Sequence, residues 1–142
     1  MKAFVIDRYK PKDGGHLADV ATPVPTADQV LVRIEAAGVN VLDSKIRSGE
    51  FKLILPYKLP LVLGNDLAGA VVEVGPSVQR FKVGDEVFAR PDKDSIGTFA
   101  EFIAIDEADL AIKPTSITMA EAASVPLVGL TAWQALVERA NV

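Results

Sequence analysis

The strongest constraint on the fold is a series of short apolar segments separated by glycine and proline. Seven segments with strand-like composition follow one another along the chain, and turn-forming residues stand between most of them. They span residues 2–7, 16–20, 29–37, 67–74, 83–89, 98–105 and 110–113. Repeated short strands favour a closed or partly closed antiparallel barrel, because closure removes exposed edges. The sequence therefore predicts a mainly β domain.

Segment 29–37 shows most clearly how one of these strands is built. Val30 and Val32 alternate with Arg33 and Glu35, so apolar and charged side chains fall on opposite faces. A period of two is that of a strand with one buried face. We therefore expect the two valines to lie in the core.

Helical signals are fewer and lie between and after these strands. Residues 41–47 lose the alternation and predict one or two helical turns that end near Gly49. Thr118 and Glu121 have the spacing of a capping box at a helix start. Pro126 either breaks that helix or opens a second one, since proline is tolerated at a first helical position.

Composition excludes several classes of protein. A chain of 142 residues with 49% hydrophobic and 24% charged residues is typical of one folded domain. The net charge of −4 and the lack of a basic block argue against a nucleic-acid partner. The absence of cysteine excludes disulfides and thiolate zinc sites. Without a long apolar run or a signal-peptide pattern, we expect a soluble, cytoplasmic protein with no membrane partner.

Four motifs carry a resemblance to a known family. Residues 38–43 (GVNVLD), 63–69 (LGNDLAG), 83–87 (VGDEV) and 129–133 (GLTAW) occur in this order. Together they resemble the medium-chain dehydrogenase/reductase superfamily, specifically its zinc-free NADPH:quinone oxidoreductase branch, over essentially the whole chain. The resemblance implies a GroES-like, partly open antiparallel barrel with a few short helices.

The same resemblance implies a division of the chain. Residues 1–125 correspond to the GroES-like catalytic domain, and residues 126–142 to a connecting helix toward a Rossmann NADPH-binding domain beyond the chain. No Gly-x-Gly-x-x-Gly run, which would cradle a dinucleotide phosphate, is present. We therefore expect the chain alone to be inactive. The resemblance also implies that the parent enzyme is a homodimer.

The positions that bind zinc in other members of the superfamily hold asparagines here. A cysteine and a histidine stand in those members where this chain has Asn40 and Asn65. A neutral amide is a weak ligand for tetrahedral zinc, and the short loop 90–97 lacks the four cysteines of a second zinc site. We therefore expect no metal. Each asparagine either caps a turn or contacts cofactor or substrate.

The resemblance implies that Asn40 lies beside the nicotinamide and the substrate, and that Thr131 approaches the nicotinamide. Hydride transfer from NADPH to a quinone or enone develops negative charge on oxygen, which needs hydrogen-bond donors. Asn40 and Lys45 are the catalytic candidates, and Asn65 is a further donor. Because Lys45 stands where a tyrosine is common, the proton comes from Lys45 or from water; alternatively, Lys45 is a solvated lysine on a turn.

Asn65, Tyr57 and Trp133 are the predicted substrate-pocket residues. Tyr57 belongs to an irregular apolar loop, residues 51–60, that is expected to shape the pocket. Trp133 either borders the cofactor cleft or packs in the core. For Asp43 and Asp66 we favour a structural ion pair or cap over a catalytic part.

Two other functions are compatible with parts of this pattern. A stand-alone GroES-like module can act as a binding or chaperone partner without catalysis, because fold alone does not fix function. A metal-dependent alcohol dehydrogenase is disfavoured by the missing cysteines.

Overall fold

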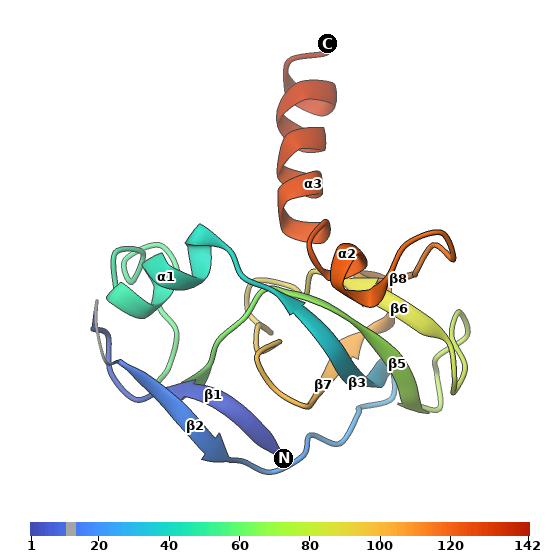
Figure 1. Ribbon diagram of the computed structural model, residues 1–142, viewed down its shortest axis with the longest axis horizontal. Coiled ribbons are helices and arrows are strands. Elements are labelled where there is room, and N and C mark those ends of the chain that lie inside the picture. Colours follow the sequence, from blue (N-terminus) through green and yellow to red (C-terminus); the bar gives the residue numbers. More distant parts are fainter. Residues whose placement is uncertain (11–13) are drawn as a thin grey trace.

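The computed structural model describes residues 1–10 and 14–142, which form two antiparallel sheets (Figure 1). The smaller sheet has the order β2-β1-β4 and the larger the order β7-β3-β5-β6-β8. The strands of the smaller sheet are β1 (Lys2–Ile6), β2 (Gly15–Asp19) and β4 (Leu61–Val62). Those of the larger sheet are β3 (Gln29–Gly38), β5 (Asp66–Val74), β6 (Glu86–Ala89), β7 (Phe102–Asp106) and β8 (Leu110–Ile112). The prediction of a mainly β fold is confirmed.

The sheets do not close into a barrel, which agrees with the partly open barrel that the resemblance implies. Within residues 1–10 and 14–142, no pairing joins the edge strands β7 and β8. An isolated bridge connects Ala3 of β1 to Ala100, two residues before β7 begins. The predicted strand 98–105 begins only at Phe102, because Thr98 and Phe99 instead donate backbone hydrogen bonds to residues 63 and 64. Strand β4 was not predicted, since two residues carry no periodicity.

Strand β3 lies inside the larger sheet, between β5 and the edge strand β7. Val30 and Val32 are fully buried and Arg33 and Glu35 are exposed, as the alternation predicts. Leu31 is buried as well, next to a β-bulge in the pairing with β5. The main core forms around these side chains from β3, β5, β6, β7 and β8.

The helices cover one end of the sheets. Helix α1 (Val41–Ser48) ends at Gly49, whose φ of 83° is left-handed and suits a glycine cap. Helix α2 (Met119–Ala123) packs against β3 and β5. Helix α3 (Pro126–Trp133) begins at Pro126 and continues as a π-helical segment, η2 (Gln134–Arg139). A short 3₁₀ helix, η1 (Glu107–Asp109), lies between β7 and β8.

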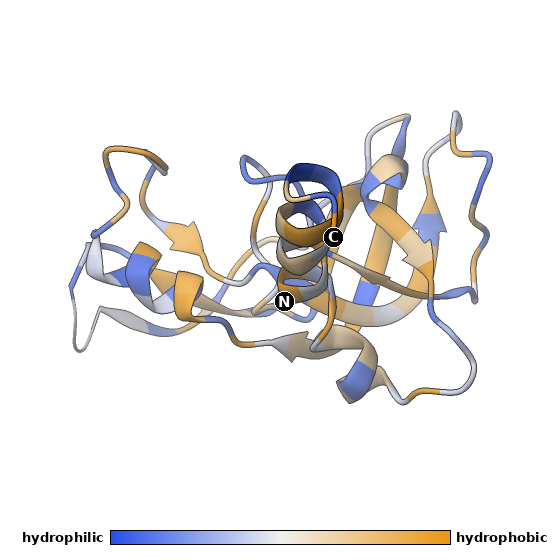
Figure 2. Ribbon diagram, turned by 90° about the horizontal axis from the view of Figure 1, so that it is seen from above, coloured by the Kyte–Doolittle hydropathy of each residue, from blue (hydrophilic) through white to orange (hydrophobic). Residues whose placement is uncertain are grey.

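Helix α3 projects away from the sheets and carries the C-terminus at its tip (Figure 1). Seen from above, hydrophobic residues run along much of this helix (Figure 2). Exposed apolar side chains include Val128, Leu130 and Trp133 of α3 and Leu136 of η2. No helix among the described residues is long and apolar enough to cross a bilayer.

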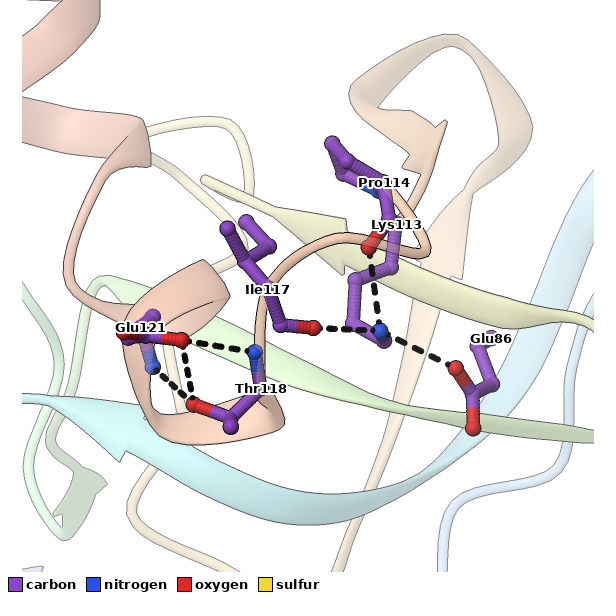
Figure 3. Close-up of polar contacts among 6 residues, drawn as sticks. All are labelled: Glu86, Lys113, Pro114, Ile117, Thr118 and Glu121. Carbon is purple, nitrogen blue, oxygen red and sulfur yellow. Dashed lines mark hydrogen bonds and ion pairs between the residues drawn. The ribbon is translucent and has the colours of Figure 1, made fainter.

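The start of α2 is held by two sets of polar contacts (Figure 3). The predicted capping box is confirmed: Thr118 N donates to Glu121 Oε2 at 2.8 Å, and Glu121 N donates to Thr118 Oγ1 at 3.2 Å. Just before it, the buried Lys113 ammonium donates to the carbonyl oxygens of Pro114 at 3.1 Å and Ile117 at 2.8 Å. These contacts fix the turn through which the chain passes from β8 to the helices.

Candidate active site

Asn40 lies where β3 passes into α1. Strand β3 ends at Gly38, where an added Cβ would lie 2.4 Å from the carbonyl oxygen of Ala123, so only glycine allows β3 to approach α2 this closely. Asn40 then takes the N-cap position of α1, and its backbone N–H donates to Asp43 Oδ2 at 2.7 Å. The strand end and the helix cap together fix the backbone of Asn40, whose side chain is half-buried.

Two buried carboxylates lie behind Asn40 and accept hydrogen bonds from both predicted asparagines. Asn65 Nδ2 donates to Asp43 Oδ1 at 2.7 Å, and Asn40 Nδ2 donates to Asp66 Oδ2. The backbone N–H of Leu127 donates to Asp66 Oδ1 at 2.8 Å. No salt bridge among the described residues involves either aspartate. Of the two expected roles, an ion pair or a cap, the ion pair is not formed, whereas the cap is confirmed for Asp43, which accepts from the N-cap N–H of Asn40.

Burial raises the pKa of both carboxyl groups, because it disfavours the charged form. For Asp43 the hydrogen bonds from Asn40 and Asn65 oppose the rise in pKa without cancelling it. For Asp66 the hydrogen bonds from Leu127 and Asn40 oppose the rise, whereas the charge of Asp43 adds to it. The donors around the pair thus favour the ionised forms that burial disfavours.

A hollow of about 420 Å³ lies between α1 and α3, and we call it the α1–α3 hollow. Asn40 lines it from one wall and Thr131 from the other. Its remaining lining residues are apolar: Val41, Leu42, Leu127, Val128, Ala132 and Ala135. The Thr131 hydroxyl donates to the Leu127 carbonyl at 2.7 Å, so its lone pairs are left for a ligand. The structure thus brings the two predicted cofactor-binding residues to one hollow.

Asn40 also borders a second hollow of about 350 Å³ between β1 and α1. Its walls combine apolar side chains with the polar face of α1: Phe4, Val39, Asp43, Ser44, Arg47, Leu63 and Phe99. Asn40 is thus the residue that the two hollows share.

The other predicted site residues lie outside the lining of the α1–α3 hollow. The Lys45 ammonium lies 5.3 Å from the centroid of the Phe51 ring. The Tyr57 hydroxyl donates to the Lys93 carbonyl at 2.7 Å, which ties loop 51–60 to the loop after β6. Trp133 is 58% exposed and lines a third hollow, of about 560 Å³, beside β6 and β8. The alternative that Trp133 packs in the core is therefore wrong for this chain.

The contact between Asp66 and Leu127 was not found from the sequence. The two residues are 61 positions apart, and no pattern connects them. The link between Asn40 and Asp43 has a recognisable signal, because a spacing of three is that of a helix cap and its partner. Among residues 1–10 and 14–142, no three His, Cys, Asp or Glu side chains are placed to hold a metal ion.

Comparison with known proteins gives matches over most of the chain. The sequence pattern of the alcohol dehydrogenase GroES-like domain matches residues 26–115. The NADPH-dependent alkenal/one oxidoreductase, chloroplastic, of Arabidopsis thaliana is 40% identical over 144 residues, which cover 96% of this chain and 37% of that protein.

Two solved structures show the same architecture. An alcohol dehydrogenase superfamily protein from Novosphingobium aromaticivorans is 47% identical, with a TM-score of 0.90 over 100% of this chain and 43% of its own. The Escherichia coli quinone oxidoreductase complexed with NADPH is 28% identical, with a TM-score of 0.86 over 99% of this chain and 41% of its own. This chain thus spans less than half the length of each of these proteins.

Proposed function

Because the chain belongs to the alcohol dehydrogenase GroES-like domain family, within the medium-chain dehydrogenase/reductase superfamily, we propose that it forms the substrate side of an NADPH-dependent quinone or enone reductase. The observation that supports this most directly is that Asn40 and Thr131 line the same α1–α3 hollow. Similarity to an NADPH-dependent alkenal/one oxidoreductase and to a quinone oxidoreductase supports the cofactor and the substrate class. Residues 1–125 are the proposed catalytic domain and residues 126–142 the connecting helix.

NADPH, when bound, supplies the hydride, and the residues of this chain bind and orient the reacting groups. One Nδ2 hydrogen of Asn40 is used by Asp66, so the second one is left to donate to a substrate oxygen that gains negative charge. The lone pairs of Thr131 Oγ1 are placed to accept from a carboxamide N–H. The apolar remainder of the lining offers a surface against which a nicotinamide ring can pack.

The other predicted residues are assigned to the substrate side. Asn65 is buried and bonded to Asp43, so we propose that it supports the site from behind. Tyr57 holds loop 51–60 in place, and Trp133 lines the hollow on the other side of α3. Lys45 or water remains the proposed proton source.

We propose that the reaction needs no metal. The groups at the two zinc-binding positions are amides, and each turns its NH₂ group toward a carboxylate. The amide oxygen that remains on each asparagine is neutral and a weak ligand for tetrahedral zinc, which prefers thiolate, imidazole or carboxylate. The residues present therefore do not fit tetrahedral zinc, and no step of the proposed mechanism passes through a metal. Stoichiometric, tightly bound zinc in the purified protein would contradict this.

Titration of the ¹⁵N-labelled chain with reduced nicotinamide mononucleotide tests the proposal. We expect shifts of the Asn40 side-chain amide and of Thr131, and we expect Asn40→Ala to weaken binding, whereas Asn141→Ala at the exposed C-terminal end leaves it unchanged. Shifts confined to other surfaces would contradict the assignment of the hollow. The chain alone should not oxidise NADPH in the presence of a quinone or trans-2-hexenal, since it lacks a phosphate cradle.

A further inference from the structure

We propose that Asp66 is a positioning residue that ties the side chain of Asn40 to helix α3, and so sets the two polar walls of the α1–α3 hollow relative to each other. The inference rests on the proposed function only for the identity of the ligand in that hollow. The tie itself rests on contacts within this chain.

The contacts form one continuous path between the two walls. Asp66 is 0% exposed, and its two oxygens accept from Asn40 Nδ2 and from the Leu127 N–H, the latter at 2.8 Å. The carbonyl of Leu127 in turn accepts from the Thr131 hydroxyl at 2.7 Å. Asn40 and Thr131 are thus connected through one carboxylate and one peptide unit.

The position of Asp66 suits this part. It is the first residue of β5 and pairs with Gly38 at the end of β3. The sheet therefore fixes the backbone of Asp66 close to Asn40. Leu127 is the second residue of α3, where backbone N–H groups have no partner within the helix. A carboxylate there satisfies one of those N–H groups and interacts favourably with the helix dipole.

An ionised carboxylate accepts from both donors at once, one with each oxygen. An asparagine at this position has one oxygen and one NH₂ group, so Asp66→Asn must lose either the Asn40 contact or the Leu127 contact. The Asn40 contact also decides which way its amide faces: with Nδ2 turned toward Asp66, its Oδ1 lies on the opposite side of the amide. Loss of the tie therefore frees the Asn40 amide to rotate or frees the start of α3.

The experiment is a pH titration of the ¹⁵N-labelled chain followed by NMR. In the wild type, the Asn40 side-chain amide and the Leu127 backbone amide are expected to shift with one shared midpoint, that of Asp66. In Asp66→Asn this shared titration disappears, and hydrogen exchange at the Leu127 amide becomes faster by about tenfold, the effect of losing one hydrogen bond. A purely packing role for Asp66 would produce no shared titration.

Asp106→Asn is the matched control. The same chemical change is made there at an exposed helix cap, where Asp106 Oδ1 accepts from the Ala108 N–H at 2.9 Å. This variant should keep the shared titration of Asn40 and Leu127. Different midpoints for the two amides in the wild type, or no response of either, would overturn the proposal. Because the wild type alone gives this result, the test stands even if Asp66→Asn does not fold.

A titration with reduced nicotinamide mononucleotide separates this inference from the proposed function. We expect Asp66→Asn to weaken binding by about fivefold or more, since the polar walls are no longer held together. Equal binding by both chains would overturn the positioning role. If the wild type shows the shared midpoint but binds no mononucleotide, the proposed function of the hollow fails and the tie stands.

Discussion

Replacing Lys113 with methionine tests what holds the turn between β8 and α2. Lys113 is 6% exposed, and its ammonium donates to two backbone carbonyls and lies 3.1 Å from Glu86 Oε2 (Figure 3). Methionine keeps most of the aliphatic volume and removes the charge. The variant therefore separates the packing of the aliphatic part of the Lys113 side chain from the polar contacts of its ammonium group.

The contributions to stability can be compared from the structure. A hydrogen bond from a charged group contributes about 1.5–3 kcal/mol, and Lys113 makes two to carbonyls. Glu86 is 57% exposed, so its ion pair should contribute only about 0–1 kcal/mol. Burying the ammonium costs several kcal/mol, which methionine avoids. We expect Lys113→Met to lower the free energy of unfolding by about 2 kcal/mol.

Urea denaturation followed by far-ultraviolet circular dichroism measures this change. With a slope of about 2 kcal/mol per M, the midpoint should fall by about 1 M. Glu86→Gln is the matched control and should lower the free energy of unfolding by less than about 1 kcal/mol. An unchanged free energy of unfolding in Lys113→Met would show that the two carbonyls need no partner. Equal losses in both variants would show that the ion pair, rather than the carbonyl contacts, holds the turn.

Two further predictions concern packing. Gly69→Ala should lower the free energy of unfolding by about 3 kcal/mol or more, because its Cβ would lie 2.1 Å from a backbone carbonyl oxygen of β3. Gly84→Ala has nothing within 4 Å of the added Cβ but a φ of 93°, and should cost only about 1–2 kcal/mol. Equal midpoints in urea for these two variants would contradict the steric argument. Ile46→Ala removes a buried side chain between α1 and the smaller sheet and should cost about 2–5 kcal/mol in the same assay, against about 0.5–1.5 kcal/mol for Ile46→Val. Similar losses for alanine and valine would show that the site collapses around the gap.

The sequence predicted the elements whose signals are local. The alternation in 29–37 identified β3 and its buried valines, and the spacing of Thr118 and Glu121 identified the start of α2. Gly49 marked the end of α1 because its left-handed backbone conformation suits glycine. Each of these signals lies within a single strand or helix and its flanking cap.

The parts that were missed depend on distant residues. Residues 98–99 have strand-like composition, yet they bond to residues 63 and 64 instead of extending β7. Helix α3 has apolar residues on all sides, so its sequence could not show that Trp133 is exposed. The motifs predicted that Asn40 and Thr131 both lie near the nicotinamide, and in the structure they line one hollow. The contact between Asp66 and Leu127 behind them could not be predicted, because it joins residues 61 positions apart.

The two buried carboxylates make a distinct prediction about pH. The pKa of Asp43 and of Asp66 is raised in the folded chain, so each binds a proton more tightly when folded than when unfolded. Such a group contributes stability that is fully present below its unfolded pKa, near 3.8, and is lost as the pH rises through the folded pKa. These two groups should therefore stabilise the chain as the pH is lowered from 7 toward 3.8.

Acids whose pKa is lowered in the folded chain change stability with pH in the opposite direction, so their contribution must be subtracted. The pKa of Asp85 and of Glu121 is lowered by their hydrogen bonds, so these two acids contribute stability that is lost as the pH falls through their folded pKa. Both are present in Asp66→Asn, so they cancel when the free energy of unfolding of that variant is subtracted from that of the wild type at each pH. The difference should shift in favour of the wild type on acidification. A flat difference, or one that shifts toward the variant, would mean that the hydrogen bonds from Asn40 and Leu127 outweigh the burial of Asp66.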